Sequence, residues 1–189
     1  MTSTASAAKL GYVGSVPGTK RDSDSWFTPK PFVDSARKVL RGITLDPFSS
    51  EVANEVVEAE HFFTQKDNAF EQDWCVKTSK RLRTVWMNPP YSGKLCREAV
   101  NRFIDEYEDG SFHEGIFLVN NSTETAWFQR ALQACNAVCF PKKRISFWNA
   151  DGKAVSGNTR GQAFFYFGND IERFANEFGE YGTIMSPKF

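Results

Sequence analysis

Histidine and closely spaced cysteine are scarce in this sequence, and this scarcity limits the kinds of site that it can form. The 189 residues include two histidines and four cysteines, and no two cysteines form a CxxC pair. Zinc sites need several Cys or His ligands at short, regular spacing. We therefore expect no metal site, and we interpret the cysteines as free thiols in a reducing compartment.

The sequence also has no excess of either basic or acidic residues, and it has no long apolar run. The 23 basic and 23 acidic residues give a formal net charge of zero, so binding of nucleic acid would require a local basic surface. No apolar run approaches the roughly 20 residues that span a membrane. The first residues lack the basic and apolar regions of a secretory signal. The sequence thus predicts a soluble cytoplasmic protein that makes no membrane contact.

The length of the chain suits one domain with a sizeable core. Residues 1–25 contain mainly Ser, Thr, Gly and Ala with scattered charges, a composition typical of a loose segment. We predict a flexible N-terminal arm over 1–25 and a single domain over 26–189.

Strand and helix patterns alternate along most of this domain. Apolar spacing predicts helices at 31–40, 51–59, 95–107 and 127–132, and strands at 43–45, 62–63, 85–87, 116–119, 137–140, 145–148 and 163–167. The last two strands flank a polar loop, 149–162, as the strands of a hairpin would. The fold class predicted is α/β: an open, mostly parallel sheet with helices on both faces and an antiparallel C-terminal hairpin. In such sheets, ligands bind at the carboxyl ends of the strands.

The stretch TVWMNPPYSG, residues 84–93, ends one of these strands in an unusual way. Proline lacks a backbone donor and fixes φ, so the strand cannot continue through Pro89 and Pro90. The residue before a proline is held extended, which stiffens Asn88 and Pro89. The result is a rigid loop that presents an amide, backbone carbonyls and an aromatic ring at a strand's carboxyl end.

A loop of this kind can activate a planar amine. The amino nitrogen of adenine is a poor nucleophile because its lone pair is delocalised into the ring. The Asn88 side-chain oxygen and the Pro89 carbonyl, held by Pro90, would accept its two hydrogens and favour a pyramidal nitrogen. Tyr91 would stack on a base flipped out of the duplex. A cytosine N4 amine or a protein glutamine amide would suit the motif too, and a strand-exit turn with a buried tyrosine is the purely structural alternative.

Six motifs in this order resemble the small phage-type Dam family of S-adenosylmethionine-dependent DNA adenine N6-methyltransferases. They are WFTP (26–29), LDPFSS (45–50), FFTQKDNAFEQDW (62–74), WMNPPYS (86–92), TAWFQ (125–129) and KKRISFW (142–148). The resemblance covers about Trp26 to Phe167. It implies a Rossmann-like methyltransferase fold, methylation of adenine N6 in DNA, and a phage or prophage protein acting in the host cytoplasm. No glycine follows Asp46, where such enzymes commonly have one, which keeps a non-catalytic DNA-binding protein as an alternative.

The resemblance also assigns residues to S-adenosyl-L-methionine and to catalysis. The catalytic set is Asn88, Pro89, Pro90 and Tyr91. The cofactor set is Trp26, Thr28, Pro29, Asp46, Pro47, Ser49, Asp67 and Phe70. Asp46 would bind the amino group of the cofactor's methionine or, alternatively, cap the helix that follows. Asp67 and Phe70 would hold its adenine.

Two dense basic clusters are the candidates for DNA phosphate contacts on this neutral chain. They consist of Lys80, Arg81 and Arg83, and of Lys142, Lys143 and Arg144. A solvated surface run is the alternative interpretation of either cluster. We expect DNA sequence to be read by loop 149–162 or by the 77–83 turn, and the oligomeric state is left open.

Overall fold

The structure is a computed structural model that describes residues 12–14, 27–148 and 159–187. Trp26, most of the expected arm at 1–25 and most of the loop at 149–162 lie outside these residues. In the part of the chain that is described, no helix is long and apolar enough to cross a membrane.

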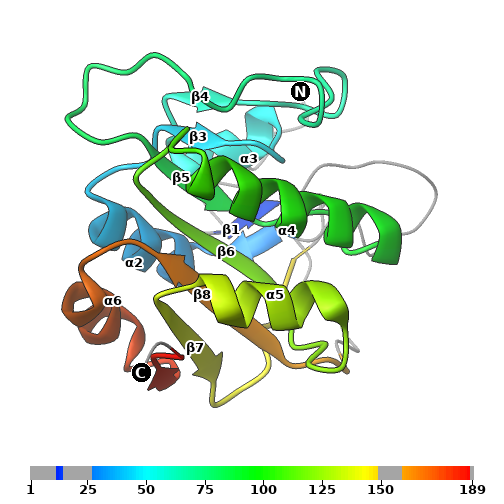
Figure 1. Ribbon diagram of the computed structural model, residues 1–189, viewed down its shortest axis with the longest axis vertical. Helices are drawn as coiled ribbons and strands as arrows, with labels where there is room; N and C mark the ends of the chain where they lie inside the picture. Colours follow the sequence, from blue (N-terminus) through cyan, green and yellow to red (C-terminus); the bar gives the residue numbers. More distant parts are fainter. Residues whose placement is uncertain (1–11, 15–26, 149–158, 188–189) are drawn as a thin grey trace, which may run out of the picture.

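Seven strands form one sheet in the order β4-β3-β5-β6-β8-β7-β9 (Figure 1). Four of them run parallel to one another: β3 (Leu45–Asp46), β4 (His61–Phe62), β5 (Thr84–Met87) and β6 (Glu114–Asn120). The other three pair antiparallel with their neighbours: β7 (Ala137–Pro141), β8 (Gln162–Phe167) and β9 (Gly182–Met185). A separate antiparallel pair joins β1 (Tyr12–Gly14) to β2 (Phe27–Pro29).

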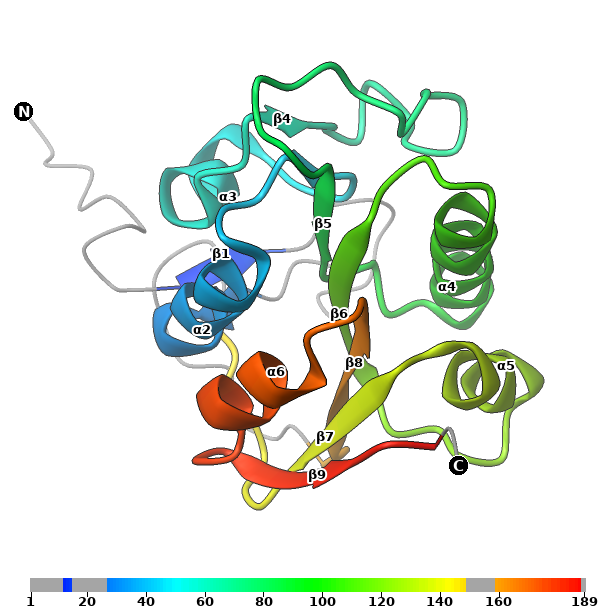
Figure 2. The same cartoon turned by 60° about the vertical axis from the view of Figure 1, so that its left-hand side comes forward.

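Helices cover both faces of the seven-stranded sheet, as Figure 2 shows. One face packs against α2 (Lys30–Leu40), α3 (Glu51–Val57) and α6 (Ile171–Phe178), and the other against α4 (Gly93–Glu108) and α5 (Ala126–Ala134). Alternate residues of a strand point to opposite faces. In β5, Trp86 therefore joins the first core, whereas Val85 and Met87 join the second. The predicted α/β class with helices on both faces is confirmed.

The predicted C-terminal hairpin is wrong. Residues 145–148 form no strand, and only Trp148 makes an isolated bridge, which is to Phe27. β8 lies between β6 and β7, so both of its hydrogen-bonding edges are already used. The sheet is also mixed rather than mostly parallel, because three of its six pairings are antiparallel.

The strand directions define two edges of the sheet. At the carboxyl edge, β3, β5, β6 and β7 end and the antiparallel β8 begins. At the amino edge, α2 ends and the chain turns through Gly42 into β3. α2 therefore starts at the carboxyl edge, which places Thr28 and Pro29 there. The chain adds β4 on one side of β3 and β5 on the other, so a topological switch point lies between β3 and β5.

Replacing Phe103 with alanine should destabilise the fold strongly. This residue is fully buried, and its ring lies 4.8, 5.0 and 5.2 Å from the ring centroids of Phe112, Phe117 and Phe167. Removing a buried phenylalanine ring typically costs about 3–5 kcal/mol, because transfer free energy is lost and a cavity remains. Urea unfolding should show a loss of this size.

Val52→Ala is the matched control, since this side chain is 42% exposed. It should change the free energy of unfolding by about 0.5 kcal/mol or less. Equal losses in the two variants would contradict a central role for the aromatic cluster.

Candidate active site

The NPPY loop leaves β5 at the carboxyl edge, as the sequence predicts. Asn88 is 2% exposed, and Pro89 and Pro90 are buried beside it. The Tyr91 hydroxyl donates a hydrogen bond of 2.9 Å to the Asn88 side-chain oxygen. Burial raises the pKa of Tyr91 well above its usual value, so this hydroxyl stays a donor. The amide oxygen of Asn88 has two lone pairs, so it can accept a second hydrogen bond while Tyr91 fixes its direction.

The Tyr91 ring is held by a residue that sequence reasoning did not assign to the site. Phe147 packs edge-on against it, with the ring centroids 5.9 Å apart. Gln162, which is 3% exposed, positions the segment that carries Phe147. Its side-chain oxygen accepts from the Ile145 amide at 3.2 Å, and its nitrogen donates to Asn120 at 3.2 Å. The motif KKRISFW contains Phe147, but nothing in its pattern indicates the contact with Tyr91.

Asp46 lies at the end of the neighbouring strand β3. Leu45, the residue before it, pairs in parallel with Val85 of β5. Asp46 lies one residue and Asn88 three residues beyond this pair, so both leave the sheet at the same edge from adjacent strands. Asp46 is 1% exposed, and this burial raises its pKa to about 7, although the Ser49 hydroxyl and the Phe48 amide act in the opposite direction. The N-cap of α3 is Ser50, whose hydroxyl accepts from the Ala53 amide at 3.1 Å. Ser50 therefore caps α3, and the alternative role of Asp46 as the cap of this helix is wrong.

Other buried polar groups lie at the same edge. The Thr28 hydroxyl oxygen is buried and has no hydrogen-bond partner among the described residues, whereas the buried Ser49 hydroxyl acts on the Asp46 carboxyl. A cavity of about 430 Å³ opens beside Ser49, between the start of α3 and residues 64–66. Buried polar groups are normally hydrogen-bonded, so the Thr28 hydroxyl and the Asp46 carboxyl are groups that a polar, cationic ligand would satisfy.

The remaining cofactor candidates lie around this loop. Pro47 is buried next to Asp46, and the Phe70 ring packs edge-on against Phe48 at 5.4 Å. Asp67 is exposed, and its carboxylate accepts from the amide and the hydroxyl of Thr64, each at 2.7 Å. The structure therefore brings Phe70 to the Asp46 loop but gives Asp67 a role in its own surface turn.

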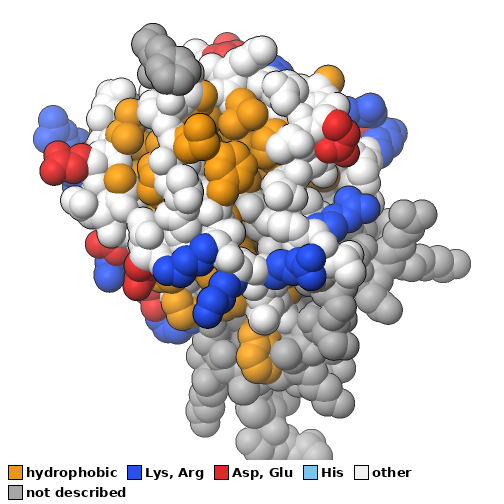
Figure 3. All heavy atoms as spheres, turned by 90° about the horizontal axis from the view of Figure 1, so that it is seen from below, with side chains coloured by type: hydrophobic (Ala, Val, Ile, Leu, Met, Phe, Trp, Pro, Cys, Tyr) orange, Lys and Arg blue, Asp and Glu red, His pale blue; other side chains and the backbone are white. Residues whose placement is uncertain are grey.

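The basic cluster at 142–144 lies at the carboxyl edge. Its three side chains follow β7 directly and are exposed. Figure 3 views the molecule from the side on which this segment lies in Figure 1, and Lys and Arg side chains gather there beside hydrophobic ones. This cluster and the NPPY loop share one edge of the sheet.

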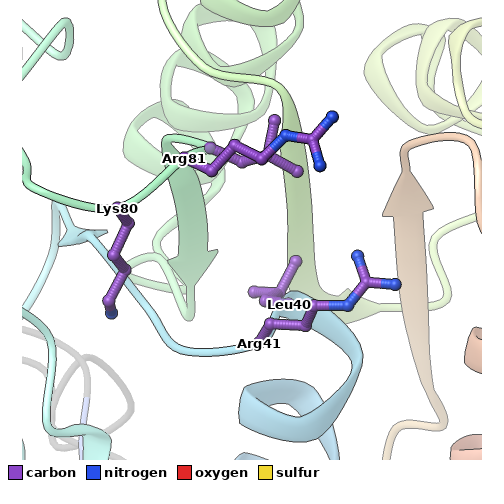
Figure 4. Close-up of a pocket in the computed structure, with 5 residues that line it drawn as sticks. Leu40, Arg41, Lys80 and Arg81 are labelled. Carbon is purple, nitrogen blue, oxygen red and sulfur yellow. The ribbon is translucent and has the colours of Figure 1, made fainter.

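The other basic cluster lies at the amino edge, because it precedes β5. Lys80 pairs with Glu60 at 3.2 Å, and the Arg83 guanidinium donates to the carbonyls of Ser111 and Gly110. Lys80 and Arg81 line a cavity of about 520 Å³ with Leu40, Arg41 and Leu82 (Figure 4). The structure does not bring this cluster to the NPPY loop.

Comparison with known protein families matches residues 17–181 to the family described as DNA N-6-adenine-methyltransferase (Dam). No curated protein and no solved structure matches the chain. The match covers most of the sequence, including both β3 and β5 with the loops that follow them. The predicted resemblance to the Dam family is thereby confirmed, and the chain belongs to the DNA N-6-adenine-methyltransferase (Dam) family.

Proposed function

We propose that this protein transfers a methyl group from S-adenosyl-L-methionine to the N6 amino group of adenine in DNA. Membership of the Dam family implies DNA adenine methylation. The observation that carries the finer assignment is the placement of Asn88 and Asp46 at the ends of adjacent strands. A preoriented, buried amide and a buried carboxyl leave adjacent strands at one edge of the sheet. Action on DNA would place the protein in the cytoplasm of a host cell, and we propose a phage or prophage origin.

The cofactor site proposed here follows from the topology. Open α/β sheets bind ligands outside the carboxyl ends of their strands at a switch point, and β3 and β5 flank the switch point of this sheet. We propose a Rossmann-like methyltransferase sheet on this basis. The Asp46 carboxylate would hold the ammonium group of the cofactor, and the hydroxyls of Thr28 and Ser49 would hydrogen-bond its polar groups. We propose that Trp26, Pro29, Pro47, Asp67 and Phe70 complete this site.

The NPPY loop would act on the adenine amine by position and by hydrogen bonding. The Asn88 oxygen and the Pro89 carbonyl accept the two N6 hydrogens, while Pro90 keeps that carbonyl in place. Tyr91 presents its ring to the flipped base and orients the Asn88 amide through the 2.9 Å hydrogen bond. These acceptors are fixed before reaction, so no reorganisation is needed as charge develops.

The cofactor supplies an electrophilic methyl group on a sulfonium. Asn88 and Pro89 would hold the N6 lone pair toward this methyl carbon. Transfer of the methyl group would leave the electrons of the carbon–sulfur bond on sulfur and release one N6 proton to water.

Digestion of treated DNA to nucleosides tests the product directly. N6-methyladenine supports the proposal, whereas N4-methylcytosine, or methylation of protein glutamine alone, would overturn it.

Asn88→Ala should reduce turnover far more than affinity. It removes an acceptor that matters most in the transition state, and loss of one such preorganised group typically slows reaction about a hundredfold to a thousandfold. Single-turnover methyl transfer should show this loss, while DNA and cofactor affinities change little. Asn88→Asp keeps an acceptor and should retain part of the activity.

Tyr91 variants provide the matched comparison. Tyr91→Phe keeps the stacking face but loses the hydroxyl that orients Asn88. It should lower the single-turnover rate less than Asn88→Ala, and Tyr91→Ala should also weaken capture of the flipped base. Full activity in a well-folded Asn88→Ala protein would disprove the catalytic assignment of the loop.

Cofactor binding should strengthen as the pH rises through about 7, which is the pKa to which burial raises Asp46. Below this pKa the carboxyl is neutral, and above it the carboxylate attracts the ammonium of the cofactor. Ionisation of the Asp46 carboxyl should therefore raise the affinity for the cofactor about tenfold between about pH 6 and about pH 8. Isothermal titration calorimetry measures this gain.

Asp46→Asn is the control, because it keeps the size of the side chain without the titrating proton. It should bind the cofactor weakly and with a flat pH dependence, and Asp46→Ala should also bind weakly. If either variant bound as tightly as the wild type at about pH 8, the cofactor site would be misplaced.

The two basic clusters should differ in their effect on DNA binding, although we propose phosphate contacts for both. Each phosphate contact contributes about 0.9 to the slope of log affinity against log salt. Neutralising Lys142, Lys143 and Arg144 together should therefore make the slope shallower by about 2–3 on a short duplex.

Neutralising Lys80, Arg81 and Arg83 should affect only a longer duplex that extends to the amino edge. Lys80→Ala with Arg81→Ala leaves the Arg83 contacts intact and controls for folding. An unchanged slope on both duplexes would identify a cluster as a solvated surface.

A further inference from the structure

A groove lies next to the NPPY loop and shares one chain segment with it. Phe147 of the 145–148 segment contacts Tyr91, whereas the residues on either side of it, Ser146 and Trp148, line a cavity of about 360 Å³. Consecutive residues of an extended segment point to opposite sides. The cavity therefore adjoins the base-capturing loop but does not include it.

The floor of the groove is aromatic and firmly held. Phe32, Trp148 and Tyr181 line it, with Pro29 and Pro141 beside them. The Phe32 and Tyr181 rings lie 4.6 Å apart, and the Tyr181 hydroxyl donates to the Pro31 carbonyl at 3.2 Å. The Lys142 amide donates to the Tyr181 carbonyl at 2.9 Å. These contacts form the groove without any ligand.

The rim of the groove is strongly basic. Lys142, Lys143 and Arg144 line it, and Glu180 is the only acidic residue among the described residues that do. All three cations are exposed, and none forms an ion pair with a residue in the described ranges. A row of cations over an apolar, aromatic floor is complementary to a nucleotide, which combines a phosphate with a flat ring.

We propose that this groove binds a nucleotide of the substrate DNA that flanks the target adenine. The cations of the rim contact its phosphates, and Trp148 provides a stacking face for its base or an apolar contact for its sugar. Stacking on an aromatic side chain tolerates any base, so the groove would position the strand rather than read its sequence. This assignment rests on the proposed function, because it takes DNA as the substrate.

Photocrosslinking tests the assignment without requiring activity or a known target sequence. DNA in which 5-iododeoxyuridine replaces thymine is irradiated with the protein, and the adducts are mapped by mass spectrometry. We expect an adduct at Trp148, in the tryptic peptide that begins at Ile145. Adducts confined to peptides outside the groove would overturn the proposal.

Variants of Trp148 separate stacking from packing. Trp148→Leu should weaken DNA binding between about fivefold and about a hundredfold, whereas Trp148→Phe should keep most of the affinity. The backbone bridge between Trp148 and Phe27 does not depend on the side chain, and thermal unfolding of each variant checks that the fold is kept. Equal DNA affinity of Trp148→Leu and the wild type would overturn the proposal.

Two further readouts distinguish the groove from the proposed function. If no methylated base is formed but Trp148 crosslinks and Trp148→Leu binds DNA weakly, the groove stands and the activity assignment falls. If methyl transfer is normal in Trp148→Leu and DNA affinity is unchanged, the groove falls and the activity stands. If Trp148→Leu weakens S-adenosylmethionine binding instead of DNA binding, the groove belongs to the cofactor, and the proposal is wrong.

Discussion

Two buried threonines fix the pairing of β3 with β5, on which the arrangement of the site depends. The Thr44 hydroxyl donates to the Thr84 carbonyl at 2.6 Å and accepts from the Thr84 amide at 2.7 Å. The Thr84 hydroxyl donates to the Gly42 carbonyl at 2.7 Å. β3 has only two residues, so its own ladder could not hold the register firmly. Because register decides which residues end level with each other, this network sets Asp46 level with Trp86, two residues before Asn88 begins the NPPY loop.

Local patterns were sufficient to predict the parts of the site that lie directly on the chain. Pro89 and Pro90 mark the end of a strand, and the apolar run before them identifies β5. The same logic placed Asp46 at a strand end. The pairing of the C-terminal strands, in contrast, joins residues that are far apart in the sequence. β8 inserts between β6 and β7, and its long-range partners cannot be deduced from its apolar run. The contact between Phe147 and Tyr91 depends on this insertion, which is why it could not be predicted.

Some elements were predictable but were missed. Ile171, Phe174 and Phe178 recur at helical spacing behind Asp170, whose carboxylate accepts from the Arg173 amide at 3.0 Å as the N-cap of α6. The positions of the two basic clusters, in contrast, could not be predicted from their composition. They look alike in composition, yet one precedes β5 and the other follows β7, so the fold places them at opposite edges. Composition identifies charge, whereas strand direction decides where the charge lies.

The burial of Asp46 also has a consequence for the stability of the protein without ligand. Its pKa in the folded state, about 7, lies above the ordinary value of 3.8 that applies to the unfolded chain. The folded state therefore holds this proton more tightly, and the stability linked to it is fully present below about pH 3.8 and lost as the pH rises through about 7. Near neutral pH the fold must accommodate a carboxylate that is isolated from water. A cation bound there would relieve this electrostatic strain, so the ligand would act as a structural counter-ion that completes the core.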